Sequence, residues 1–70
     1  MSTTIDEVML LAARAKAVSD LNYIFTQLES GGKATRQGDV ILIKIDGEEL
    51  ALTLDNAIDY INALVEKYAN

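Results

Sequence analysis

Residues 40–53 read VILIKIDGEELALT, two runs of β-forming residues on either side of the dipeptide Asp46-Gly47. Asp-Gly is a favoured pair for the centre of a type I′ turn, because both central positions need a positive φ. A two-residue turn also fixes the pairing register, so Ile45 is expected opposite Glu48. The stretch therefore predicts a β-hairpin with a defined register.

This register sorts the hairpin side chains by chemical type. One face is aliphatic and carries Ile41, Ile43, Ile45, Leu50 and Leu52. The other face is mixed and carries Val40, Leu42, Lys44, Glu49, Ala51 and Thr53. A slip of one residue would scatter the aliphatic set over both faces, so the pattern specifies the register strongly.

Upstream of the hairpin, apolar residues recur at helical spacing over residues 4–30. Thr4 followed by Glu7 fits a capping box, in which each side chain satisfies an unpaired backbone N–H group. The glycine pair that begins at Gly31 is a helix stop signal. Ser19 could instead cap a second helix, so one long helix and two shorter ones both remain open.

Downstream of the hairpin, Thr53 is expected to cap a helix of about four turns. Its apolar face is expected to comprise Leu54, Ala57, Ile58, Ile61, Leu64, Val65 and Tyr68. The opposite side carries Asp55, Asp59, Asn62 and Glu66. The predicted order is helix, glycine-rich loop, two-stranded hairpin, helix. The fold class is thus α+β (α-β-β-α), in a single domain over residues 1–70.

The composition excludes several kinds of chemistry. The chain has 70 residues, with 6 Lys and Arg against 11 Asp and Glu, a net charge of -5, and no Cys, His, Pro or Trp. Disulfides, Cys/His zinc sites, histidine bases and cysteine nucleophiles are therefore ruled out. The acidic balance argues against direct nucleic-acid or membrane partners. We expect a protein that is not an enzyme and has no metal and no cofactor.

The beginning of the chain gives no targeting signal. The apolar stretch at residues 8–13 follows two acids instead of a basic segment, and Arg14 and Lys16 follow it closely. No run of about 18 apolar residues exists that could span a bilayer. We expect a soluble, cytoplasmic protein.

Size and geometry indicate self-association. A domain this short buries only about 60% of its unfolded surface, and a two-stranded sheet is not stable alone. The first helix would be about 40 Å long and the last about 25 Å, so the first must overhang. Two arrangements would cover its apolar residues. Either the first helix is kinked and folds back on its own chain, or two copies form an isologous contact, with helix against helix or hairpin edge against hairpin edge. We favour the isologous contact, with interface candidates Met9, Leu10, Leu11, Ala13, Val40 and Leu42.

The segment GGKATRQG, residues 31–38, concentrates three glycines and two cations in an acidic chain. Such a loop can turn backbone N–H groups and charged donors toward an anion. It can equally be a solvated connector, because it follows a helix C-terminus and does not match a P-loop. The candidate anion ligands are Gly32, Lys33, Thr35, Arg36 and Gln37, joined in an oligomer by Arg14 and Lys16 of a neighbour.

These patterns predict a stoichiometric binding protein that acts as a homo-oligomer. It would block a host protein, as phage or mobile-element inhibitors do, or sequester a small nucleotide-like anion through residues 31–38. One alternative is a structural or adaptor protein of a larger assembly. Another is an acidic antagonist of a basic nucleic-acid-binding protein, which would use Asp46, Glu48, Glu49, Asp55, Asp59 and Glu66.

Overall fold

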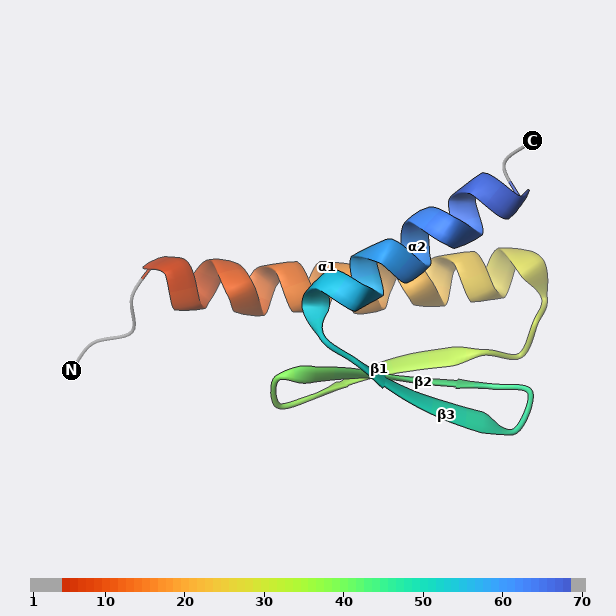
Figure 1. Cartoon of the computed structure of the whole chain (residues 1–70), viewed down its shortest axis with the longest axis horizontal. Helices are drawn as coiled ribbons and strands as arrows, with labels where there is room; N and C mark the ends of the chain where they lie inside the picture. Colours follow the sequence, from red (N-terminus) through yellow and green to blue (C-terminus); the bar gives the residue numbers. More distant parts are fainter. Residues whose placement is uncertain (1–4, 69–70) are drawn as a thin grey trace.

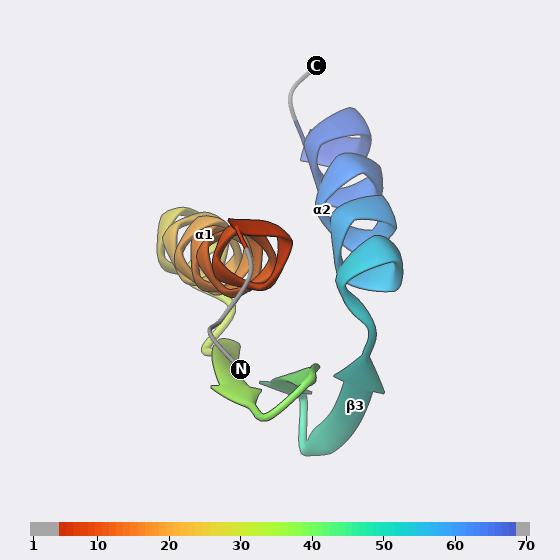
Figure 2. The same cartoon turned by 90° about the vertical axis from the view of Figure 1, so that its left-hand side faces the viewer.

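The computed structural model describes residues 5–68, which form two helices on one face of a three-stranded antiparallel sheet (Figure 1). The elements are α1 (Ile5–Leu28), β1 (Lys33–Gln37), β2 (Val40–Ile45), β3 (Glu48–Leu52) and α2 (Leu54–Tyr68). Figure 2 looks along α1 and shows α1 above β1 and α2 above β3. The fold is α+β as predicted, but its order is α-β-β-β-α.

The prediction of a two-stranded sheet is wrong, because part of the expected glycine-rich loop is a strand. β1 lies antiparallel to β2, and the two-residue turn Gly38-Asp39 joins them. Gly38 has a φ of +60°, as the first central position of a type II′ turn requires. The Gly-Asp pair was thus an available hairpin signal. It was obscured because β1 contains a single apolar residue, Ala34.

The hairpin of β2 and β3 has the register that its turn predicts. Ile45 pairs with Glu48. Asp46 and Gly47 have φ values of +54° and +79°, which fit the two central positions of a type I′ turn. Local turn chemistry therefore determines this pairing.

The core lies between the aliphatic face of the sheet and the two helices. Its largest fully buried side chains are Phe25, Leu21, Ile41 and Ile43, and three buried alanines, Ala17, Ala34 and Ala57, complete it. The predicted aliphatic face of the hairpin packs here, although Leu50 remains 40% exposed. Helices cover this one face of the sheet only (Figure 2).

The second helix begins where the sequence predicts. The Oγ1 atom of Thr53 accepts a hydrogen bond from the Asn56 N–H at 3.3 Å, which confirms the cap. The predicted apolar face is only partly used: Ala57 is buried, whereas Ile58 and Val65 are 42% and 47% exposed. For Val65 the reason is visible in Figure 1, where the C-terminal end of α2 rises away from the sheet.

The first helix is continuous, so the break considered at Ser19 does not occur. The predicted capping box includes Thr4, which lies outside the described residues. At the other end the helix stops before the glycine pair. Glu29 takes the left-handed position with a φ of +53°, and its N–H group and that of Ser30 donate to the carbonyls of Thr26 and Phe25, each at 3.2 Å. This is a Schellman motif with glutamate where glycine is usual.

Replacing Glu29 by glycine is expected to stabilise the protein by about 1 kcal/mol, because an L residue is strained at a left-handed φ. The melting temperature should rise by about 5 °C for a chain of this size. Circular dichroism during heating measures the change. Glu29→Ala is the matched control, since it removes the charge and keeps the Cβ atom. An equal gain from both variants would assign the effect to charge and not to backbone conformation.

Candidate functional site

The N-terminal part of α1 extends beyond the rest of the fold. Figure 1 shows its first turns projecting past the β1–β2 turn and past the start of α2. The molecule accordingly measures 44 × 26 × 17 Å. We call residues 5–13 the overhang. The expected length mismatch between the two helices is thus present.

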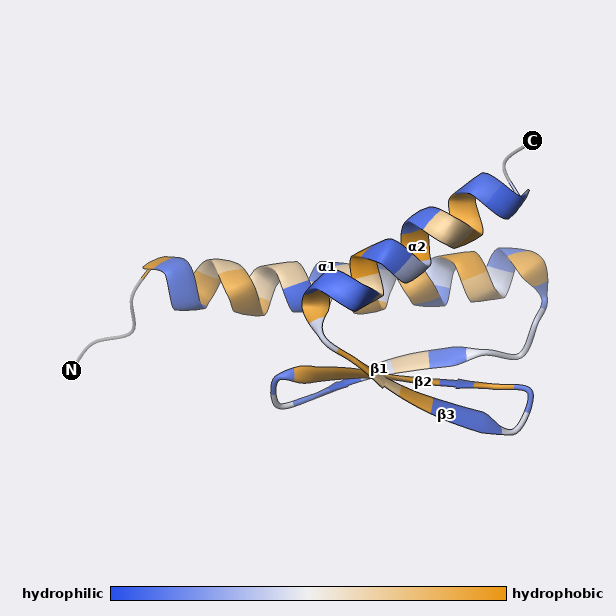
Figure 3. Ribbon diagram, in the orientation of Figure 1, coloured by the Kyte–Doolittle hydropathy of each residue, from blue (hydrophilic) through white to orange (hydrophobic). Residues whose placement is uncertain are grey.

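Most residues of the overhang are hydrophobic (Figure 3), and its large apolar side chains are exposed. The exposed fractions are 77% for Ile5, 53% for Val8, 63% for Met9, 43% for Leu10 and 46% for Leu11. Successive residues of a helix are rotated by about 100°, so these five side chains surround the helix axis. A helix that is apolar all round is normally buried. Of the predicted interface residues of α1, Met9, Leu10 and Leu11 therefore lie on an uncovered surface, whereas Ala13 is half-buried.

One side of the overhang continues the buried stripe of α1. Residues three or four apart lie on the same face of a helix, so the face of the buried Ala17 continues toward the N-terminus through Arg14, Leu10, Leu11 and Glu7. These residues and Asp39 line a groove of about 410 Å³ under the overhang. The groove is apolar in the middle and charged at both ends.

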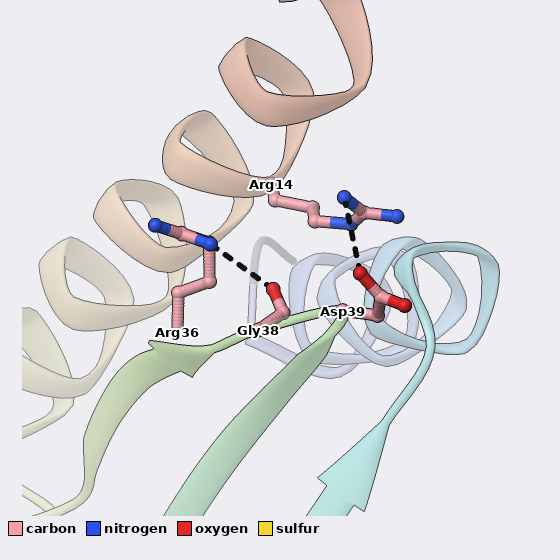
Figure 4. Close-up of polar contacts among 4 residues, drawn as sticks. All are labelled: Arg14, Arg36, Gly38 and Asp39. Atoms are coloured by element: carbon pink, nitrogen blue, oxygen red, sulfur yellow. Dashed lines mark hydrogen bonds and ion pairs between the residues drawn. The ribbon is translucent and has the colours of Figure 1, made fainter. Parts of the chain in front are cut away.

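Two arginines contact the Gly38-Asp39 turn at the inner end of this groove, and their guanidinium groups point in different directions (Figure 4). Arg14 comes from α1 and lies 3.9 Å (Nη1 to Oδ1) from Asp39. Arg36 comes from β1 and its Nη1 donates to the Gly38 carbonyl at 3.0 Å. The Arg14 side chain is only 17% exposed, and its Nε is buried without a hydrogen-bond partner among the described residues. A buried donor of this kind costs about 1–3 kcal/mol until an acceptor reaches it.

The predicted anion ligands do not converge on one site. Strand alternation places Lys33, Thr35 and Gln37 on the sheet face turned away from the helices, where they line a second groove with Leu42 and Lys44. Lys33 and Lys44 are direct cross-strand partners there. The flexible-loop geometry that motivated the anion hypothesis is therefore absent.

The two other predicted anion ligands, Gly32 and Lys16, lie in neither groove. Gly32 packs on the core, because a Cβ atom at this position would lie 3.0 Å from the Phe25 ring. Lys16 is paired with Asp20 at 2.9 Å along α1. Of the seven predicted anion ligands, Lys33, Thr35 and Gln37 share one groove. Arg14 and Arg36 both contact the Gly38-Asp39 turn within one chain, whereas the sequence suggested Arg14 from a neighbour.

The hairpin candidates for the interface are less accessible than those on α1. Val40 and Leu42 are half-buried on the outer sheet face. The sequence reasoning missed Asp39 and assigned Glu7 only to a cap. The dipeptide Gly38-Asp39 could have located Asp39 in a turn, but not beside Arg14.

Three further observations bear on function. Within residues 5–68, no three acidic, cysteine or histidine side chains are grouped to hold a metal ion. Neither described helix combines the length and apolarity that a bilayer crossing requires. Comparison with protein-family models, with curated proteins and with solved structures gives no match.

Proposed function

We propose that this protein is a small, non-enzymatic binding protein that acts stoichiometrically in the cytoplasm by burying its overhang against another protein chain. The observation that carries the proposal is the ring of exposed apolar side chains on residues 5–13. Inhibition of a target protein by occupation of its surface is the biological outcome that suits such a molecule, as for inhibitors of phage or mobile elements.

The energetics favour docking. Full burial of a Leu, Ile or Met side chain contributes on the order of 1.5–3 kcal/mol, and those of the overhang are roughly half exposed. Five such residues together offer several kcal/mol toward the cost of association. A 70-residue chain has a small core of its own, so a partner also adds to its folding stability.

Capture of a small anion is the second candidate function. It is supported by the contacts of Arg14 and Arg36 with one turn and by the buried Arg14 Nε, which has no acceptor within residues 5–68. Guanidinium groups bind carboxylate and phosphate oxygens well. This site keeps Arg14 and Arg36 of the predicted anion ligands and leaves out the other five.

Native mass spectrometry of the purified protein tests the first proposal. We expect the wild type to carry at least one further protein chain and Leu10→Glu/Leu11→Glu to be a bare monomer, because four charges would enter an isologous contact. The matched control is Ile58→Glu/Val65→Glu. Those side chains are 42% and 47% exposed, almost the same as the two leucines, but lie on α2. The control should keep the wild-type assembly.

The result also separates the two candidate functions. A small-molecule adduct on a monomer that survives Leu10→Glu/Leu11→Glu would favour anion capture. A folded Leu10→Glu/Leu11→Glu variant that retains the wild-type protein assembly would contradict docking through the overhang.

A further inference from the structure

We propose that the partner of the overhang is a second copy of this chain, packed antiparallel about a twofold axis. The acidic tip of one helix, Asp6 and Glu7, would then lie at the arginine pair of the other, Arg14 and Arg36. This inference rests on the proposed function and names the occupant of the same surface.

The charge distribution of the overhang is the first argument. Its tip carries the two acids, a charge of -2, and its base carries Arg14, Arg36 and Asp39, a charge of +1. An antiparallel twofold pair brings tip to base twice, so both contacts are attractive. A parallel pair would place tip against tip and base against base, where like charges repel.

The spacing is the second argument. We place the twofold axis midway between Leu10 and Leu11. In an antiparallel pair, residues at equal distances on either side of the axis face each other, so position 7 of one helix lies opposite position 14 of the other. Glu7 of one copy then faces Arg14 of the other. Positions 7 and 14 are seven residue steps apart, about 10.5 Å along the helix, so both charges lie within the overlapping turns.

The third argument is that these residues share one side of the helix. Glu7, Leu10, Leu11 and Arg14 all line the groove under the overhang. A helix in this groove presents its own leucines to the leucines of its partner and its own Glu7 to the partner's Arg14. The surface is thus self-complementary, as an isologous contact requires.

The fourth argument is the unsatisfied donor at the base. Asp39 lies 3.9 Å from Nη1 of Arg14, and its side chain is 93% exposed, so this pair is weak. Arg14 Nε remains without an acceptor within residues 5–68. A carboxylate from the tip of a second copy would give the accessible part of the Arg14 guanidinium a further acceptor, and the site would be complete only in the dimer.

A charge-swap experiment tests the pairing. The tip variant is Asp6→Lys/Glu7→Lys and the base variant is Arg14→Glu/Arg36→Glu. At a concentration where the wild type is dimeric, each variant alone should be monomeric, with a dissociation constant raised at least tenfold by like charges. An equimolar mixture should form a heterodimer, because its two tip-to-base contacts are both attractive. Native mass spectrometry distinguishes the three species by mass.

Three results would overturn the inference: a wild type that is monomeric up to millimolar concentration, a folded variant that dimerises like the wild type, or folded variants that do not form a heterodimer. Circular dichroism checks the fold. If the largely buried Arg14 does not tolerate glutamate, Arg36→Glu alone serves as the base variant, since that side chain is exposed. A monomeric wild type that binds a different protein through Leu10 and Leu11 would refute the homodimer and leave the proposed function standing.

Discussion

Replacement of Phe25 by alanine is expected to leave much of the isolated chain unfolded at 25 °C. The ring is 1% exposed and lies at the centre of the contact between α1 and the sheet, with the Gly32 backbone against its face. A Phe→Ala change in a core costs about 3–5 kcal/mol. A single core in a domain of this size supplies about the same amount. The loss therefore matches the whole stability of the monomer.

Urea denaturation followed by circular dichroism measures this loss. Tyr23→Ala is the matched control: it removes an aromatic ring from the same helix, two residues away, where the side chain is 67% exposed. The control should change the free energy of unfolding by no more than about 0.5 kcal/mol. Similar losses in both variants would show that the ring of Phe25 does not anchor the core.

Asn22→Ala is expected to have the second largest effect, a loss of about 2 kcal/mol. The Asn22 side chain joins α1 to β1: its Nδ2 donates to the Ala34 carbonyl at 2.9 Å, and its Oδ1 accepts from the Ala34 N–H at 2.7 Å. Each hydrogen bond contributes about 1 kcal/mol net to the free energy of unfolding. The loss is larger where the backbone group left without its partner is shielded from water.

Two further variants isolate this contribution. Asn22→Asp keeps the acceptor and replaces the donor by an oxygen, which faces the Ala34 carbonyl, so a loss of at least half that of Asn22→Ala is expected. Asn62→Ala makes the same substitution on an exposed position of α2 and should be neutral or slightly stabilising. If denaturant unfolding shows no greater loss of free energy of unfolding for Asn22→Ala than for Asn62→Ala, the hydrogen bonds between Asn22 and Ala34 do not stabilise the fold.

The parts of the fold that were predictable are those that local chemistry specifies. The Asp46-Gly47 turn and the Thr53 cap act within a few residues, and both occur as expected. β1 was missed because it buries only Ala34 and is held by β2 and by Asn22, twelve residues away. β1 is stabilised by contacts with other segments of the chain, so the residues of the strand alone do not predict it.

The candidate site also has one part that the sequence predicted and one part that it did not. Helix lengths alone predicted that α1 would overhang, and Leu10 and Leu11 are exposed as expected. The contact of Arg14 and Arg36 with one turn was not predictable, because it requires residues 33–37 to be a strand. Only strand alternation turns Arg36 to the same face as Ala34, toward α1.

The amide of Asn22 has one more consequence, which concerns aggregation. β1 is an outer strand of the sheet, and the Ala34 peptide groups that Asn22 binds are those not used by β2. Free groups of this kind recruit strands from other molecules and lead to domain swapping or fibrils. Asn22 occupies them in the manner of a neighbouring strand, so at this point α1 closes the sheet to further growth. This favours intermolecular extension of the sheet at β3, at the opposite margin of the molecule.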